Sequence, residues 1–119
     1  VQIDKMALPP CYLYFQFFVE GENLNMFALQ RSGDLFLGVP YDMALFTMIL
    51  NHVAAAVGLK PKTVKMEVVD AHIYDNATEQ VKTYLDRPLF HQPTYRFVDD
   101  QIILADYKRG KSIKCSVAV

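Results

Sequence analysis

The stretch from residue 12 to residue 31 constrains the fold more than any other part of this sequence. Residues 12–19 and 24–31 are two runs of aromatic and aliphatic residues, separated by the turn sequence Gly21-Glu22-Asn23. Such runs on either side of turn residues predict a β-hairpin. In the first strand the apolar side chains fall on both alternate faces, with Leu13, Phe15, Phe17 and Val19 on one and Tyr14 and Phe18 on the other. A hairpin that is apolar on both faces needs a second layer and often a subunit partner.

The rest of the chain predicts an α+β fold, with a mixed sheet and a long buried helix. Pro40 suits the first turn of that helix, which is apolar nearly all round and is closed by Gly58. Residues 63–69 alternate between apolar and charged side chains, as expected for a strand with one solvated face. The remaining expected elements are a short helix from Asp75 or Asn76 to about Leu85 and two strands at 95–98 and 101–104, around the turn pair Asp99-Asp100.

Composition limits the classes of function. The 119 residues suit one domain with one core, and 52% of them are hydrophobic. A net charge of −1 gives no field that would attract nucleic acid or a membrane, so we expect neither as a partner. Cys11 and Cys115 have no metal-ligand spacing and make no disulfide framework. We therefore expect no metal site and a cytoplasmic protein.

Cys11 is the first candidate for chemistry. It follows Pro9 and Pro10, which fix the backbone and end regular structure, and it precedes the first strand. A thiolate is a strong nucleophile, and a nearby guanidinium such as that of Arg31 would stabilise its charge. The alternative interpretation is a buried, inert cysteine, which is the commoner fate of this residue type.

The sequence as a whole resembles the C-terminal half of proteins of the thymidylate synthase family. Four blocks in the family's order carry the resemblance: residues 4–11 (DKMALPPC), 30–40 (QRSGDLFLGVP), 70–74 (DAHIY) and 117–119 (VAV). The resemblance implies a thymidylate-synthase-like mixed sheet and a homodimer with sheets stacked back to back. It also implies that residues 1–119 are the C-terminal portion of a single catalytic domain whose upstream half is absent.

The resemblance further implies an enzyme that transfers a one-carbon unit from 5,10-methylenetetrahydrofolate to C5 of a pyrimidine nucleoside monophosphate. Cys11 matches the nucleophile, and Asp34 matches an acid that binds the pterin ring and helps proton movements there. The nucleotide-binding residues that the resemblance implies are Gln30, Arg31, Ser32, Asp42, His72 and Tyr74. The folate-binding residues that it implies are Asp34, Leu37, Gly38, Tyr41 and Ala118, the last lying in a tail that closes over the ligands.

Asp42 departs from the family, because thymidylate synthases carry Asn at the position that reads the base. An amide can donate to O4 of uracil and accept from its N3–H. A carboxyl group can accept from N4 of cytosine and, if protonated, donate to N3. Asp at this position is typical of the family's deoxycytidylate hydroxymethylases. The alternative interpretation of Asp42 is a cap at the N-terminus of a helix.

The chain departs from the family at three other places. The synthases carry His where this chain has Tyr12, and Cys or Ala where it has Gly33, which we take as neutral. Residues 108–112, within the basic loop 107–114, replace the family's sequence there. We have no account of Tyr12 from the sequence, and the basic loop is either a solvated surface or a contact for an anionic ligand tail. The resemblance, together with Asp42, thus predicts dCMP hydroxymethylation as the main function. The alternatives are thymidylate synthesis from dUMP, methylation of a cytosine nucleotide, use of CMP, or a fragment that only dimerises and binds ligands.

Overall fold

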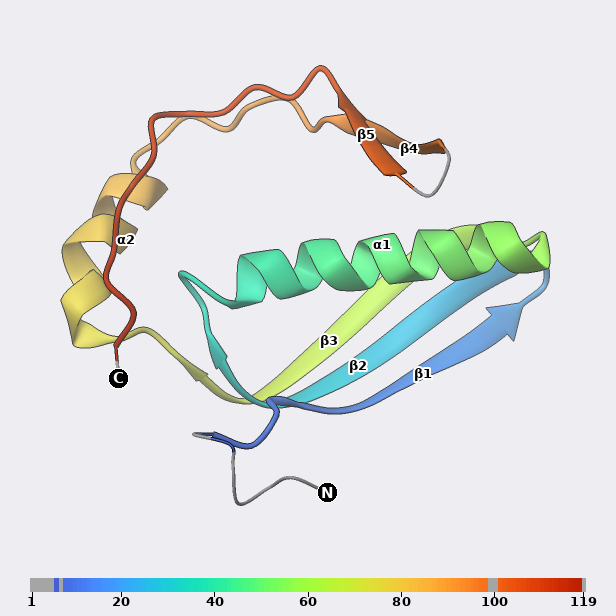
Figure 1. The fold of residues 1–119 in the computed structure, drawn as a ribbon, viewed down its shortest axis with the longest axis horizontal. Helices are drawn as coiled ribbons and strands as arrows, with labels where there is room; N and C mark the ends of the chain where they lie inside the picture. The colour runs from blue at the N-terminus through green and yellow to red at the C-terminus, as the bar shows by residue number, and fades with distance from the viewer. Residues whose placement is uncertain (1–5, 7, 99–100, 119) are drawn as a thin grey trace. The chain divides into compact units, whose positions relative to one another are not determined.

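A computed structural model describes residue 6, residues 8–98 and residues 101–118 of the chain. The chain divides into two units, Val1–Ile73 and Tyr74–Val119, and each is treated by itself. The predicted lead-in residues 1–5 and 7, the predicted turn at Asp99-Asp100 and the terminal Val119 lie outside the described residues. The elements are those of a mixed α+β fold, which confirms the fold class (Figure 1).

The first unit is a three-stranded mixed sheet covered by one long helix. Strand β1 (Tyr12–Glu20) pairs antiparallel with β2 (Asn23–Asp34), which confirms the predicted hairpin. Helix α1 (Val39–Val57) then connects β2 to β3 (Lys60–His72), which lies parallel to β2. A parallel pair needs such a crossover connection. Because β2 pairs with both β1 and β3, it is the central strand of the order β1-β2-β3.

The core of this unit lies between β2 and α1. Leu24, Met26 and Ala28 of β2 alternate along the strand and so face one side of the sheet. Phe46, Leu50 and Ala54 recur every four residues and so line one stripe of α1. These six residues form one buried cluster. Each fully buried large side chain in it contributes about 1.5–3 kcal/mol to stability.

Helix α1 begins after Gly38 and carries Pro40 in its first turn. It ends at Gly58, whose φ of 70° is left-handed, and this confirms the predicted closing glycine. Within the described residues the sheet covers only one side of the helix. Other apolar residues of α1 are exposed, namely Met43, Leu45 and Val57.

A β-bulge near the start of β1 changes which face Tyr12 occupies. Tyr12 pairs with Gln30 and Tyr14 pairs with Leu29, so one residue of β1 is left extra between them. The bulge turns Tyr12 toward α1, where its ring meets the ring of Phe46 edge-on at 5.5 Å between centroids. Strict alternation would have placed Tyr12 on the same face as Tyr14.

The second unit contains a helical segment and a small hairpin. A 3₁₀ turn, η2 (Asp75–Ala77), leads into α2 (Thr78–Leu85), so the predicted short helix opens as a tighter turn. Strands β4 (Thr94–Val98) and β5 (Gln101–Ala105) pair antiparallel, as predicted. The C-terminal segment runs back to the start of this unit, where the Asn76 amide donates to the Ser116 carbonyl at 3.0 Å.

Candidate active site

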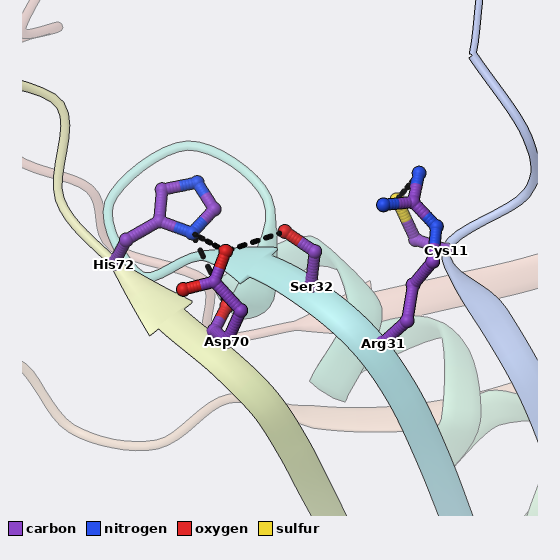
Figure 2. A network of polar contacts seen from close by, with 5 residues as sticks. All are labelled: Cys11, Arg31, Ser32, Asp70 and His72. Atoms are coloured by element: carbon purple, nitrogen blue, oxygen red, sulfur yellow. Dashed lines mark hydrogen bonds and ion pairs between the residues drawn. The ribbon is translucent and has the colours of Figure 1, made fainter.

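Cys11 and Arg31 lie side by side at the start of β1 and near the end of β2. The Arg31 backbone N–H donates to the Cys11 carbonyl at 2.9 Å, and Arg31 Nη2 lies 3.7 Å from Cys11 Sγ (Figure 2). The guanidinium also donates to the carbonyls of Pro9 at 2.7 Å and Pro10 at 3.2 Å. The proline carbonyls therefore help to hold the cation beside the sulfur.

Cys11 is exposed, so the interpretation of a buried cysteine is wrong. The thiolate is the nucleophilic form of cysteine, and the guanidinium beside Sγ is a positive charge with which a thiolate can pair. The structure thus brings together the two residues that the sequence predicts as nucleophile and phosphate ligand. Those two roles stay predictions.

Asp42 lies in the first turn of α1, but its side chain does not cap the helix. The N-cap is Gly38, which has no side-chain cap, and the Asp42 carboxylate accepts two hydrogen bonds from the sheet instead. Tyr12 Oη donates to Oδ1 at 2.6 Å, and Gln30 Nε2 donates to Oδ2 at 2.9 Å. The capping interpretation is therefore wrong, although the helix N-terminus still favours a negative charge there.

The contact with Asp42 also changes the acidity of Tyr12. The hydrogen bond to Asp42 raises the pKa of Tyr12 from 10.0 to about 12, together with partial burial and the negative charges of Asp42 and Cys11. The phenol therefore keeps its proton throughout the physiological pH range. It is a constant hydrogen-bond donor to the carboxylate.

Gln30 and Gly33 pack tightly behind this contact. Gln30 is fully buried, and its Oε1 is a buried acceptor without a partner among the described residues. A Cβ at Gly33 would lie 2.9 Å from Val39 Cγ2 and 3.0 Å from Val68 Cγ1, closer than side chains approach one another. A larger residue at position 33 therefore requires these side chains to shift, and the interpretation of Gly33 as a neutral replacement stays a prediction.

Ser32 and His72 are joined through a residue that the sequence reasoning missed. Ser32 Oγ donates to Asp70 Oδ2 at 3.3 Å, and His72 Nδ1 lies 3.4 Å from that same oxygen and 3.1 Å from the Asp70 carbonyl (Figure 2). Asp70 precedes His72 by two residues on β3, and such residues face the same side of a strand. That spacing was the signal available in the sequence.

Asp34 organises the loop that joins β2 to α1. Its Oδ1 accepts the backbone N–H groups of Phe36 at 2.9 Å and Leu37 at 3.2 Å, and its carbonyl accepts the N–H of Gly38 at 3.0 Å. A Cβ at Gly38 would lie 3.3 Å from that carbonyl oxygen, a tight contact that glycine avoids. Tyr41 projects from the first turn of α1 and is 78% exposed.

Comparison with known proteins decides the family. The model of the thymidylate synthase family matches residues 1–119. The chain belongs to the thymidylate synthase family. It is 38% identical to the thymidylate synthase of Mycoplasma pneumoniae over 127 aligned residues, which cover 99% of this chain and 44% of that protein. It is 41% identical to the thymidylate synthase of Mycoplasma genitalium over 104 residues, which cover 87% of this chain and 36% of that protein.

This thymidylate synthase family chain thus spans less than half the length of the curated relatives that it matches. Of its predicted site residues, Cys11 contacts Arg31, and Gln30 donates a hydrogen bond to Asp42, which also accepts one from Tyr12. Tyr74 and Ala118 belong to the second unit, and their ligand contacts stay predictions. In the described part of the chain no helix is both long and apolar enough to span a membrane.

Proposed function

We propose that the protein carrying this chain transfers a one-carbon unit from 5,10-methylenetetrahydrofolate to C5 of a pyrimidine nucleoside monophosphate. The observation that carries this proposal is the exposed Cys11 thiol with the Arg31 guanidinium 3.7 Å from its sulfur. The names of the relatives support the same reaction class. We also propose a reducing cytoplasmic location, since the nucleophile must stay a free thiol.

In the proposed reaction the Cys11 thiolate adds to C6 of the pyrimidine. The C5–C6 double bond gives its electrons to C5, which then attacks the methylene carbon carried by the folate. The proton on C5 leaves, and the bond between the transferred carbon and the folate nitrogen breaks, which releases tetrahydrofolate and leaves an exocyclic methylene on the Cys11-bound nucleotide. The C6–S bond breaks after this methylene has reacted, and the thiolate is released. Addition of water to that methylene gives a hydroxymethyl product, whereas hydride from the folate gives a methyl product.

Arg31 suits a phosphate ligand as well as a partner of the sulfur. A guanidinium has five N–H donors, and the contacts with Pro9, Pro10 and Cys11 use those on Nε and Nη2. The two donors on Nη1 remain for phosphate oxygens. We propose Ser32 as a supporting nucleotide contact, and His72 and Tyr74 as ligands of the sugar hydroxyl. Gln30 is fully buried, so we propose that it supports the nucleotide through its hydrogen bond to Asp42.

The folate side of the proposed site is the loop between β2 and α1. We propose that Asp34 binds the pterin ring and helps its proton movements, through the carboxylate oxygen that does not hold the loop. Leu37, Gly38 and Tyr41 follow on that loop and the first turn of α1, and Ala118 lies in the C-terminal segment. The exposed ring of Tyr41 is suited to cover an aromatic ligand.

Two observations favour different bases. The relatives are named thymidylate synthase, which favours dUMP and a methyl product. Asp42 favours cytosine, because its carboxylate does not cap the helix and is held by two donors in the position expected to read the base. We therefore propose thymidylate synthesis as the function supported by the comparisons and dCMP hydroxymethylation as the second candidate, supported by Asp42.

Release of tritium from C5 of labelled dUMP and dCMP, assayed side by side, tests this proposal. The assay uses the full natural polypeptide that contains these residues, with and without methylenetetrahydrofolate. We expect folate-dependent release from at least one nucleotide. Release from dUMP alone supports thymidylate synthesis, and release from dCMP alone supports the cytosine reaction. Release from neither would contradict the proposed enzyme and favour a module that only binds.

We propose that the partner of this chain is a second copy of itself. The sheet face away from α1 carries exposed aromatic rings. Tyr14 and Phe18 of β1 both lie on this face and are about half exposed, and the Tyr14 ring lies against the ring of Phe27 on β2. Aromatic faces of this kind are typical of subunit interfaces. Replacement of Phe18 by Glu is expected to shift the sedimenting mass toward the monomer. An unchanged mass, or a wild type that sediments as a monomer, would contradict this interface.

A further inference from the structure

We propose that Tyr12 is a positioning residue that sets the base preference of the site by holding the Asp42 side chain as a double hydrogen-bond acceptor. This inference rests on the part of the proposed function in which Asp42 meets the base. It assigns a role to the residue that follows the nucleophile, which sequence patterns alone leave unexplained.

The geometry places one donor on each oxygen of the carboxylate. Tyr12 Oη is 2.6 Å from Oδ1, and Gln30 Nε2 is 2.9 Å from Oδ2. Two donors on two different oxygens fix the plane of the carboxylate, because rotation about the Cβ–Cγ bond would break both hydrogen bonds. A carboxylate has about four acceptor positions, so each oxygen keeps capacity for a ligand.

The two donors are themselves held by the fold. Gln30 is fully buried on the central strand, so its amide has little freedom to turn away. Tyr12 reaches Asp42 only because the bulge between Tyr12 and Tyr14 turns it toward α1, where its ring packs on Phe46. Bulges of this kind re-aim side chains and are frequent beside active sites.

This environment fits a carboxylate better than the amide found in thymidylate synthases. With Asn at position 42, the NH₂ group would face either the Gln30 amide donor or the Tyr12 hydroxyl. In the first case the Gln30 amide would have to flip, and in the second Tyr12 would have to accept instead of donate. A carboxylate accepts from both donors without either rearrangement, and each of its oxygens can also accept a hydrogen bond from N4 of cytosine.

Removal of the hydroxyl leaves Asp42 anchored through Oδ2 alone. In a Tyr12→Phe variant the ring can still pack on Phe46, so the fold is retained, but the carboxylate is free to rotate away from the base. A hydrogen bond to a charged group is stronger than one between neutral groups, so its loss should be measurable. We expect the preference for dCMP over dUMP to fall by about 10-fold, since 1.4 kcal/mol corresponds to that factor.

A double-mutant cycle on the full natural polypeptide tests the inference. The variants are Tyr12→Phe, Asp42→Asn and the double variant, and the readouts are the ratios of kcat/KM and of Kd for dCMP and dUMP. Tyr14→Phe is the matched control, because it removes a phenol hydroxyl from the same strand on the opposite face, where that hydroxyl bonds Gln16. We expect Tyr12→Phe to lower the ratio when Asp42 is intact, and to change it less than about twofold in the protein that already carries Asp42→Asn.

Equal loss of activity toward both nucleotides in Tyr12→Phe, with the ratio unchanged, would overturn the inference and leave Tyr12 as a packing residue. The same fall in both backgrounds would also overturn it, since Tyr12 would then act without Asp42. If the wild type turns over neither nucleotide, the proposed function is wrong. The Kd ratios of the four proteins then still decide whether Tyr12 acts on the base through Asp42.

Discussion

Replacement of Cys11 by Ser is expected to abolish turnover of the pyrimidine nucleotide, by a factor on the order of 10⁴ or more, while nucleotide binding persists. A serine hydroxyl is almost fully protonated at neutral pH and is a far weaker nucleophile than a thiolate beside a guanidinium. The contacts proposed for the nucleotide come from Arg31, Ser32 and Asp42, which the substitution leaves in place. Tritium release measures the turnover, and equilibrium dialysis measures the nucleotide Kd.

Cys115→Ser is the matched control for this prediction. Cys115 is the other cysteine of the chain, lies in the second unit and makes weak contacts with the Asn76 and Ser116 carbonyls. We expect this variant to keep wild-type turnover. Turnover that survives in Cys11→Ser would refute the assignment of the nucleophile, whatever the control shows.

Asp42→Asn is expected to move the ratio of kcat/KM for dCMP and dUMP toward dUMP by about 10- to 100-fold. The amide can donate to O4 of uracil and accept from its N3–H, whereas cytosine needs an acceptor opposite N4. A matched pair of hydrogen bonds to a base edge is worth about 1–3 kcal/mol against the wrong base, which corresponds to this range. Initial rates over a range of both nucleotides give the two constants.

Asp75→Asn makes the same chemical change in the first turn of another helical segment and serves as the control. We expect it to leave the base ratio unchanged. A ratio that also stays constant in Asp42→Asn would mean that Asp42 does not read the base. The cytosine candidate would then be rejected in favour of thymidylate synthesis.

The elements that are marked by a local pattern of apolar, charged or turn residues were predictable from the sequence. The apolar run at 12–19 and the turn at Gly21 indicated the hairpin, and the alternation at 63–69 indicated β3. The contact between Arg31 and Cys11 followed from the residue types together with the family resemblance. These features depend on local pattern, which a single sequence contains.

The features that the sequence did not predict depend on how separate elements pack against one another. No local signal marks the bulge between Tyr12 and Tyr14, so the position of Tyr12 beside Asp42 could not be foreseen. The crowding at Gly33 comes from Val39 and Val68, which only the βαβ crossover brings near it. Helix capping was a reasonable interpretation of Asp42 until Tyr12 and Gln30 proved to bind its carboxylate.

Covalent capture of the nucleotide by Cys11 tests the central claim most directly. The full natural polypeptide is incubated with methylenetetrahydrofolate and with 5-fluoro-dUMP or 5-fluoro-dCMP, denatured, digested and analysed by mass spectrometry. Fluorine at C5 cannot leave as a proton does, so the adduct should accumulate. We predict a mass increase equal to nucleotide plus folate on the peptide that contains Cys11. An adduct on another residue, or none although the nucleotide binds, would contradict the account.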